Sequence, residues 1–191
     1  MKRQIEKHSE GRMKFFTPEL YLRYNSPDDA VADRADQEWE EAIRAYREQL
    51  KYFLSMMDER VKGLVQGQCL HDAEVLSLEE NVADLPLSLP FKTSVTIISL
   101  RIDKKIIDII YLTWAGIRET AAPRGWPFSK LRPHWLYEEI DFEPGPAPIP
   151  RFWHRILWSD GRVTSIPFFD VIVHSFSEEN PDPATITRRR A

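Results

Sequence analysis

One carboxylate and one imidazole stand on the apolar faces of two predicted strands late in the chain. Side chains alternate between the two faces of a strand, so every second residue shares a face. On this count Glu138 belongs to one apolar face and His154 to another. If the two strands pair about the Pro- and Gly-rich turn between them, Glu138 and His154 face each other inside the sheet. The residues that share the two faces are His134, Leu136, Glu138, Ile140 and Phe142, and Phe152, His154, Ile156 and Trp158.

This pair could carry two kinds of chemistry, because a carboxylate and an imidazole held away from water must pair or change protonation state. Joined by His134 and by His71-Asp72, they would offer the three or four nitrogen and oxygen ligands that zinc takes. Without a metal, Glu138 would orient His154 as a general base. A hydrogen-bonded polar pair, or a pair facing solvent on an open sheet, explains the same pattern. The candidate catalytic residues are therefore His71, Asp72, Glu138 and His154, with no role and no metal assigned.

Cys69 is the only cysteine of the chain, which excludes an intramolecular disulfide and a zinc site built from several thiolates. Cys69 and His71 share one face of a predicted strand, as a thiolate–imidazolium couple requires. At this spacing their Cβ atoms lie too far apart for a direct hydrogen bond. The alternative is that Cys69 is a small buried hydrophobe.

Residues 116–133 form a long predicted loop with three prolines, and loops of this length are usually functional or poorly ordered. The loop places two aromatic rings between basic residues, a composition like that of a protein-binding hot spot. The alternative is that the rings fold back and plug one end of the sheet. The predicted protein-binding residues are Trp126, Phe128, Lys130, Arg132 and Trp135.

The elements that position these residues begin with a long helix. Ser26-Pro27-Asp28-Asp29 is a helix start, with Ser26 as the cap and Pro27 in the first turn. From Val31 to Val61 apolar residues recur every three or four positions, which predicts one helix over 27–62. So long a helix packs over a sheet, breaks in the middle, or pairs with a second copy to give a homodimer.

After this helix, β-branched and aromatic residues predict short strands near 69–78, 93–102, 106–115, 134–142, 151–158 and 162–175. The last hairpin can be registered, because pairing His154 with Ile166 keeps the apolar faces together. This register requires a loop over 159–161 with Gly161 in the left-handed conformation. The same register pairs Ile156 with Thr164 and Phe152 with Phe168.

These elements predict an α+β fold in which one long N-terminal helix packs on an antiparallel sheet of five or six strands, closed into a half-barrel or a sandwich. The expected organisation is a disordered extension over 1–12, a single domain over 13–176 with its sheet over 69–176, and a flexible tail over 177–191. At 191 residues, with 42% hydrophobic and 29% charged residues, the chain has the composition of one folded domain.

Charge and hydropathy narrow the classes of partner. The formal net charge is −4. The sequence does not show the clustered basic face that nucleic-acid binding needs, so we expect no nucleic-acid partner. No apolar run reaches the roughly 18 residues of a membrane span, and no signal-peptide pattern opens the chain. We therefore expect a cytoplasmic protein without cofactor, whose partner is another protein.

Three motifs resemble an uncharacterised bacterial domain of unknown function and, more loosely, immunity proteins that neutralise toxins. They are Leu70-His71-Asp72-Ala73-Glu74-Val75, His134-Trp135-Leu136-Tyr137-Glu138-Glu139, and His154-Arg155-Ile156-Leu157 with Ser159-Asp160-Gly161-Arg162. The resemblance covers residues 64–176 and implies a bacterial, cytoplasmic protein without established catalytic residues. The expected function is a non-enzymatic protein-binding or immunity-type module. The alternative is a small metal-dependent hydrolase built on the His/Glu cluster.

Overall fold

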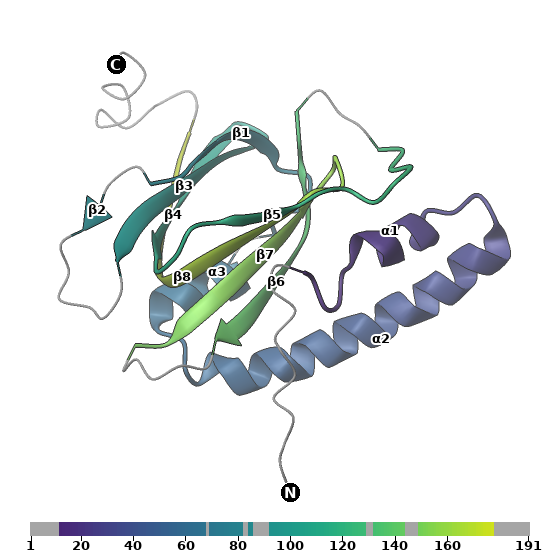
Figure 1. Cartoon of the computed structure of the whole chain (residues 1–191), viewed down its shortest axis with the longest axis horizontal. Coiled ribbons are helices and arrows are strands. Elements are labelled where there is room, and N and C mark those ends of the chain that lie inside the picture. The colour runs from purple at the N-terminus through teal and green to yellow at the C-terminus, as the bar shows by residue number, and fades with distance from the viewer. Residues whose placement is uncertain are drawn as a thin grey trace, which may run out of the picture.

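The structure, a computed structural model, describes residues 12–67, 69–81, 84–85, 92–128, 132–143 and 149–177. The predicted extension and tail fall almost wholly outside these ranges. Three helices precede the sheet, and α1 packs against α2 (Figure 1). They are α1 (Pro18–Tyr24), α2 (Asp29–Leu54) and α3 (Glu59–Gly67). Within the described part of the chain, no helix combines the length and the apolar character needed to cross a bilayer.

The predicted helix over 27–62 is matched only in part, because it is broken between Ser55 and Asp58. Asp58 starts α3 as a new cap, since its Oδ1 accepts the N–H of Val61 at 2.9 Å. The break lets Met57 turn into the core, where 4% of its surface is exposed. The start of α2 also differs from expectation: Asp28, not Ser26, accepts the N–H of Val31.

In the described ranges the sheet has eight strands, all paired antiparallel, in the order β1-β3-β4-β8-β7-β6, with β2 on β3 and β5 on β8. This confirms the α+β class and the antiparallel sheet. The first predicted strand begins later than expected, because residues 71–72 form a turn. The strands are β1 (Glu74–Glu79), β2 (Asp84–Leu85), β3 (Thr93–Ile102), β4 (Lys105–Thr113), β5 (Arg118–Thr120), β6 (Trp135–Glu143), β7 (Arg151–Trp158) and β8 (Val163–Ser177).

The two outer strands of this order, β1 and β6, meet at one end and make the sheet a half-barrel. Glu74 forms a bridge with His134, and the N–H of Trp135 donates to the carbonyl of Ala73 at 2.9 Å. Figure 1 shows the curled sheet with α2 along one side and α3 near β8. The contact between β1 and β6 brings the segment before β1 beside the start of β6, where the candidate site lies.

Two hydrophobic cores use the two faces of the sheet. The first fills the concave side and includes Tyr111, Ile140 and Ile156 from the strands and Val61 from α3. The second lies on the convex side of β6 and β7, under α1 and α2. It contains Met13, Phe16, Leu20, Ala35, Trp39, Leu136, Leu157 and Val163. The apolar stripe of α2 is thus partly used within the chain, and a homodimer through residues 27–62 stays a prediction.

The hairpin of β7 and β8 has the predicted register, with His154 opposite Ile166. Gly161 adopts a φ of +84°, a backbone angle that residues other than glycine rarely adopt. A Cβ on Gly161 would also lie 2.5 Å from the ring of Trp126. The glycine is therefore required by both the turn and its neighbour.

Candidate functional site

The structure brings Glu138 and His154 together on the concave side of the sheet. Glu138 stands opposite Ile156 and His154 opposite Ile140, so the two ionisable side chains are diagonal neighbours. Glu138 Oε2 lies 3.6 Å from His154 Nε2. The imidazole is fully buried, whereas 26% of the Glu138 side chain is exposed. The predicted meeting of the two groups is confirmed.

Tyr111 of β4 contacts the other side of the His154 imidazole. The sequence did not predict Tyr111 as a residue of this site. Its hydroxyl lies 2.9 Å from His154 Nδ1. Burial raises the pKa of Tyr111 well above its usual value, and the charge of Glu138 raises it further, so the hydroxyl keeps its proton and can donate. The donor and acceptor in this contact depend on the imidazole tautomer: where Tyr111 donates to Nδ1, the imidazole proton is on Nε2, the nitrogen that faces Glu138.

The facing atoms of Glu138 and His154 are buried but not hydrogen-bonded. Neither Glu138 Oε2 nor His154 Nε2 has a hydrogen-bond partner, and 3.6 Å is beyond a normal N–H···O distance. An unpaired buried polar atom costs about 1–3 kcal/mol. These two atoms are among six such atoms in the described residues, and they are the pair that adjoins a pocket, because Glu138 also lines it.

The pocket, which we call the Glu138 pocket, has a volume of about 320 Å³. One wall is the segment before β1, and the other is the first part of β6. Its lining residues are Cys69, Leu70, His71, Trp135, Leu136, Tyr137 and Glu138. The site therefore combines an apolar and aromatic wall with one carboxylate, which is the usual composition of a small-ligand site.

The candidates His71 and Asp72 lie in a turn rather than on a strand, and His71 lines the pocket. Asp72 has a φ of +65°, and its N–H donates to the carbonyl of Trp135 at 2.8 Å. His71 Nδ1 lies 3.2 Å from a carboxylate oxygen of Asp72. Within the described ranges no three or more His, Cys, Asp or Glu side chains gather as metal ligands would. The zinc interpretation finds no ligand set there.

A β-bulge corrects the predicted face of β6. The pairing with β7 shifts between Trp135 and Tyr137, so Trp135 points into the first core and Leu136 into the second. His134, expected beside Glu138, instead has its Nδ1 3.0 Å from the carbonyl of Arg132. The bulge therefore removes His134 from the site and supplies the indole of Trp135, whose ring centroid lies 5.4 Å from that of His154.

Of the predicted protein-binding residues, Trp126 and Phe128 fold back onto α1. Trp126 stacks on Tyr21 at 5.6 Å, and its indole N–H donates to the carbonyl of Ser159 at 2.9 Å. Phe128 packs edge-on against both rings, and both side chains are half-buried. This is the plug that the sequence offered as the alternative.

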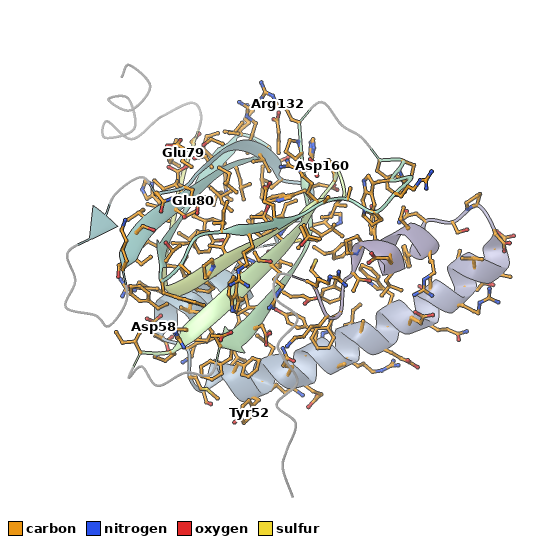
Figure 2. All side chains as sticks on the ribbon, in the orientation of Figure 1. Tyr52, Asp58, Glu79, Glu80, Arg132 and Asp160 are labelled. Atoms are coloured by element: carbon orange, nitrogen blue, oxygen red, sulfur yellow. The ribbon has the colours of Figure 1, made fainter. Side chains whose placement is uncertain are left out.

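The other three predicted binding residues separate from this cluster. Trp135 is 1% exposed and belongs to the first core, so it is not a surface residue. Arg132 forms an ion pair with Glu74 at 2.9 Å, and Figure 2 shows it at the outer edge of the molecule. Lys130 lies outside the described residues.

Glu139, next to Glu138, points to the convex side and is fully satisfied. Its carboxylate accepts the backbone N–H groups of Lys14 at 2.8 Å, Phe15 at 2.6 Å and Phe16 at 2.7 Å. Burial raises the pKa of Glu139, although the three N–H donors lower it. This carboxylate fastens the segment before α1 to the sheet.

Asp141 extends this fastening on the same face. It lies 2.7 Å from Lys14 Nζ and 3.2 Å from a guanidinium nitrogen of Arg155. The Arg155 side chain is only 3% exposed. A buried guanidinium needs such a partner, because an unpaired buried charge is strongly unfavourable. We call Glu139, Asp141, Arg155 and Lys14 the convex clasp.

A second pocket, of about 450 Å³, lies between the segment before α1 and the loop after β5. It is the larger of the two, but it contains none of the residues that the sequence singled out. Its lining residues are Arg12, Met13, Thr17, Pro18, Glu19, Thr120, Ala121, Pro123 and Val163. Its size alone gives no chemistry, so we retain the Glu138 pocket as the candidate site.

Comparison with known proteins finds no match for this chain. No protein-family model matches the chain, and no curated protein and no solved structure matches it. The function is therefore argued from the residues of the Glu138 pocket.

Proposed function

We propose that this protein is a non-enzymatic binding module that holds a small ligand in the Glu138 pocket. The observation that carries the proposal is the buried, unpaired pair of atoms on Glu138 and His154 under an apolar pocket. Folded proteins retain few such atoms unless a water, an ion or a ligand uses them. A volume of about 320 Å³ suits a ligand with one ring, at the lower end of known small-ligand sites.

The test is a fragment titration followed by two-dimensional amide NMR of the full chain. We expect fragments with one ring to shift the amide signals of residues 69–71 and 135–138 in a saturable way. The variant Glu138→Gln should weaken these shifts, and Glu79→Gln should not. Glu79 is a suitable control because it is an exposed carboxylate at the end of β1 (Figure 2). Saturable shifts confined to other regions would contradict the proposal.

Hydrolysis at the same site is the second candidate function, and the array of Tyr111, His154 and Glu138 favours it. In this array Glu138, whose Oε2 lies 3.6 Å from His154 Nε2, would act as a general base that takes a proton from water. Turnover of ester or phosphoester substrates that is lost in Glu138→Gln and kept in Glu79→Gln would support an enzyme over a binding module.

A protein-binding or immunity-type role, as the sequence suggests, is the third candidate. Its support is the half-buried ring cluster of Tyr21, Trp126 and Phe128 near the surface. A pull-down compares the unmodified chain with the double variant Trp126→Ala/Phe128→Ala, and Tyr52→Ala controls for loss of an exposed ring. Identical partners for all three proteins would count against this role.

A further inference from the structure

The Glu138 pocket has a negative charge that its own lining does not neutralise. None of the residues that line it is Lys or Arg. The described ion-pair partner of Glu138 is His154 alone. Asp72 does not line the pocket, but its negative charge reaches one residue of the lining, because it contributes, after burial, to the raised pKa of Tyr137. The field inside the pocket therefore favours a positive ligand.

His154 is engaged on its other side, because its Nδ1 lies 2.9 Å from the Tyr111 hydroxyl. Its Nε2 lies 3.6 Å from Glu138 Oε2, and neither of these two facing atoms has a hydrogen-bond partner. The buried Oε2 of Glu138 faces His154, and the partly exposed carboxylate lines the pocket. The Glu138 carboxylate is therefore a hydrogen-bond acceptor in a pocket whose lining residues include no Lys or Arg.

The walls suit the body of an organic cation. Trp135, Tyr137, Leu70 and Leu136 are among the residues that line the pocket, and of the two aromatic residues Tyr137 is the one that is partly exposed. Aromatic faces attract ammonium and guanidinium groups, and this attraction is strongest where water is excluded. Tyr137 is held in place by Trp39, with ring centroids 4.5 Å apart, and by His71 at 5.3 Å. The aromatic wall is therefore rigid before a ligand arrives.

We infer that the ligand of the Glu138 pocket is a small organic cation, a primary ammonium or a guanidinium on an apolar or aromatic body, with Glu138 as its counter-charge. This inference rests on the proposed binding function. The cation would donate N–H bonds to the carboxylate, while its apolar body lies against Tyr137 and the two leucines. Glu138 is the anchor, and His154, whose other ring nitrogen contacts the Tyr111 hydroxyl, lies 3.6 Å from the Glu138 carboxylate.

The test compares three probes of equal size that differ in charge: benzylamine, benzyl alcohol and benzoate. Each is titrated at pH 7 into the unmodified chain, with the amide shifts of residues 69–71 and 135–138 as the readout. We expect benzylammonium to bind about tenfold more tightly than benzyl alcohol, because its hydrogen bonds to Glu138 are charge-assisted, and benzoate to bind most weakly. In Glu138→Gln the preference for the cation should disappear, and in Glu79→Gln it should persist.

Each outcome is informative, because the comparison of probes needs no variant to fold. Binding of benzyl alcohol or benzoate as tight as that of benzylammonium overturns the cation inference and leaves the proposed binding function standing. Absence of saturable shifts at the pocket with all three probes overturns both. A cation preference that survives in folded Glu138→Gln removes Glu138 as the anchor and overturns the inference.

Discussion

Glu138 and Glu139 are neighbours on β6, yet the two faces of the sheet treat their carboxylates in opposite ways. On the convex side Glu139 accepts three backbone N–H groups and is 2% exposed. On the concave side Glu138 has a buried oxygen without a hydrogen-bond partner and lines a pocket. Because strand residues alternate between faces, one step along the chain separates a carboxylate used for folding from one left open.

The difference separates polar groups that are hydrogen-bonded within the fold from polar groups that are left without a partner. The convex clasp joins residues more than a hundred positions apart in the sequence. Within it the Glu139 carboxylate is hydrogen-bonded by three backbone N–H groups, whereas Nε of Arg155 has no hydrogen-bond partner. The array on the concave side is complete at Tyr111 and incomplete at Glu138. We therefore expect the clasp to contribute to stability, and the open carboxylate is the group that we propose binds a ligand.

The largest effect is expected from breaking the convex clasp. Asp141→Ala removes the carboxylate that lies 3.2 Å from the buried guanidinium of Arg155, and losing one partner of a buried pair costs about 3–5 kcal/mol. Denaturant unfolding measures this loss. The matched control, Asp36→Ala on the exposed face of α2, should change the free energy of unfolding by less than about 0.5 kcal/mol. A similarly small change for Asp141→Ala would show that the clasp does not stabilise the fold.

A smaller effect is expected on the concave side. His154→Leu removes the acceptor of the Tyr111 hydroxyl and leaves that buried group unpaired, at a cost of about 1–3 kcal/mol. The double variant His154→Leu/Tyr111→Phe should recover part of the lost stability, because it has no buried Tyr111 hydroxyl without a hydrogen-bond partner. A double-mutant cycle measures the coupling, which we expect to be about 1 kcal/mol. Strictly additive free energies of unfolding would mean that the 2.9 Å contact contributes nothing.

The smallest effect concerns alkaline pH. The folded chain raises the pKa of Tyr111, so the unfolded chain loses this proton first as pH rises above about 10. Stability conferred by the neutral hydroxyl is therefore complete below pH 10 and falls by up to about 1.4 kcal/mol for each pH unit above it.

Tyr111→Phe should remove part of this alkaline loss of stability. It should not remove all of it, because burial also raises the pKa of Tyr46. Unfolding measured from pH 9 to pH 11 provides the comparison, and Tyr52→Phe is the exposed control. Equal slopes for Tyr111→Phe and the unmodified chain would place Tyr111 in contact with solvent, contrary to the structure.

Local patterns predicted part of this site. The meeting of Glu138 and His154 followed from alternation along two strands, and the register of β7 and β8 from the turn at Gly161. The bulge at Leu136 had no signal, because neither glycine nor proline marks it. Alternation consequently placed His134 in the site, where the structure has Trp135.

The missed residues depend on contacts that local patterns do not encode. Tyr111 reaches His154 only because β8 lies between β4 and β7, and strand order is not read from periodicity. The clasp at Glu139 uses backbone N–H groups of residues 14–16, which every residue except proline has. The apolar stripe predicted the helical segments. It did not predict the break before α3, because that break depends on how the helices pack against the two cores.

The most direct test of the contrast compares two isosteric variants, Glu138→Gln and Glu139→Gln, by denaturant unfolding. In Glu139→Gln an amide NH₂ meets a backbone N–H donor, so we expect a loss of about 2 kcal/mol or more. In Glu138→Gln no protein hydrogen bond is lost, and we expect stability within about 0.5 kcal/mol of the unmodified chain. Equal losses in the two variants, or a larger loss in Glu138→Gln, would contradict the assignment of Glu138 to ligand binding.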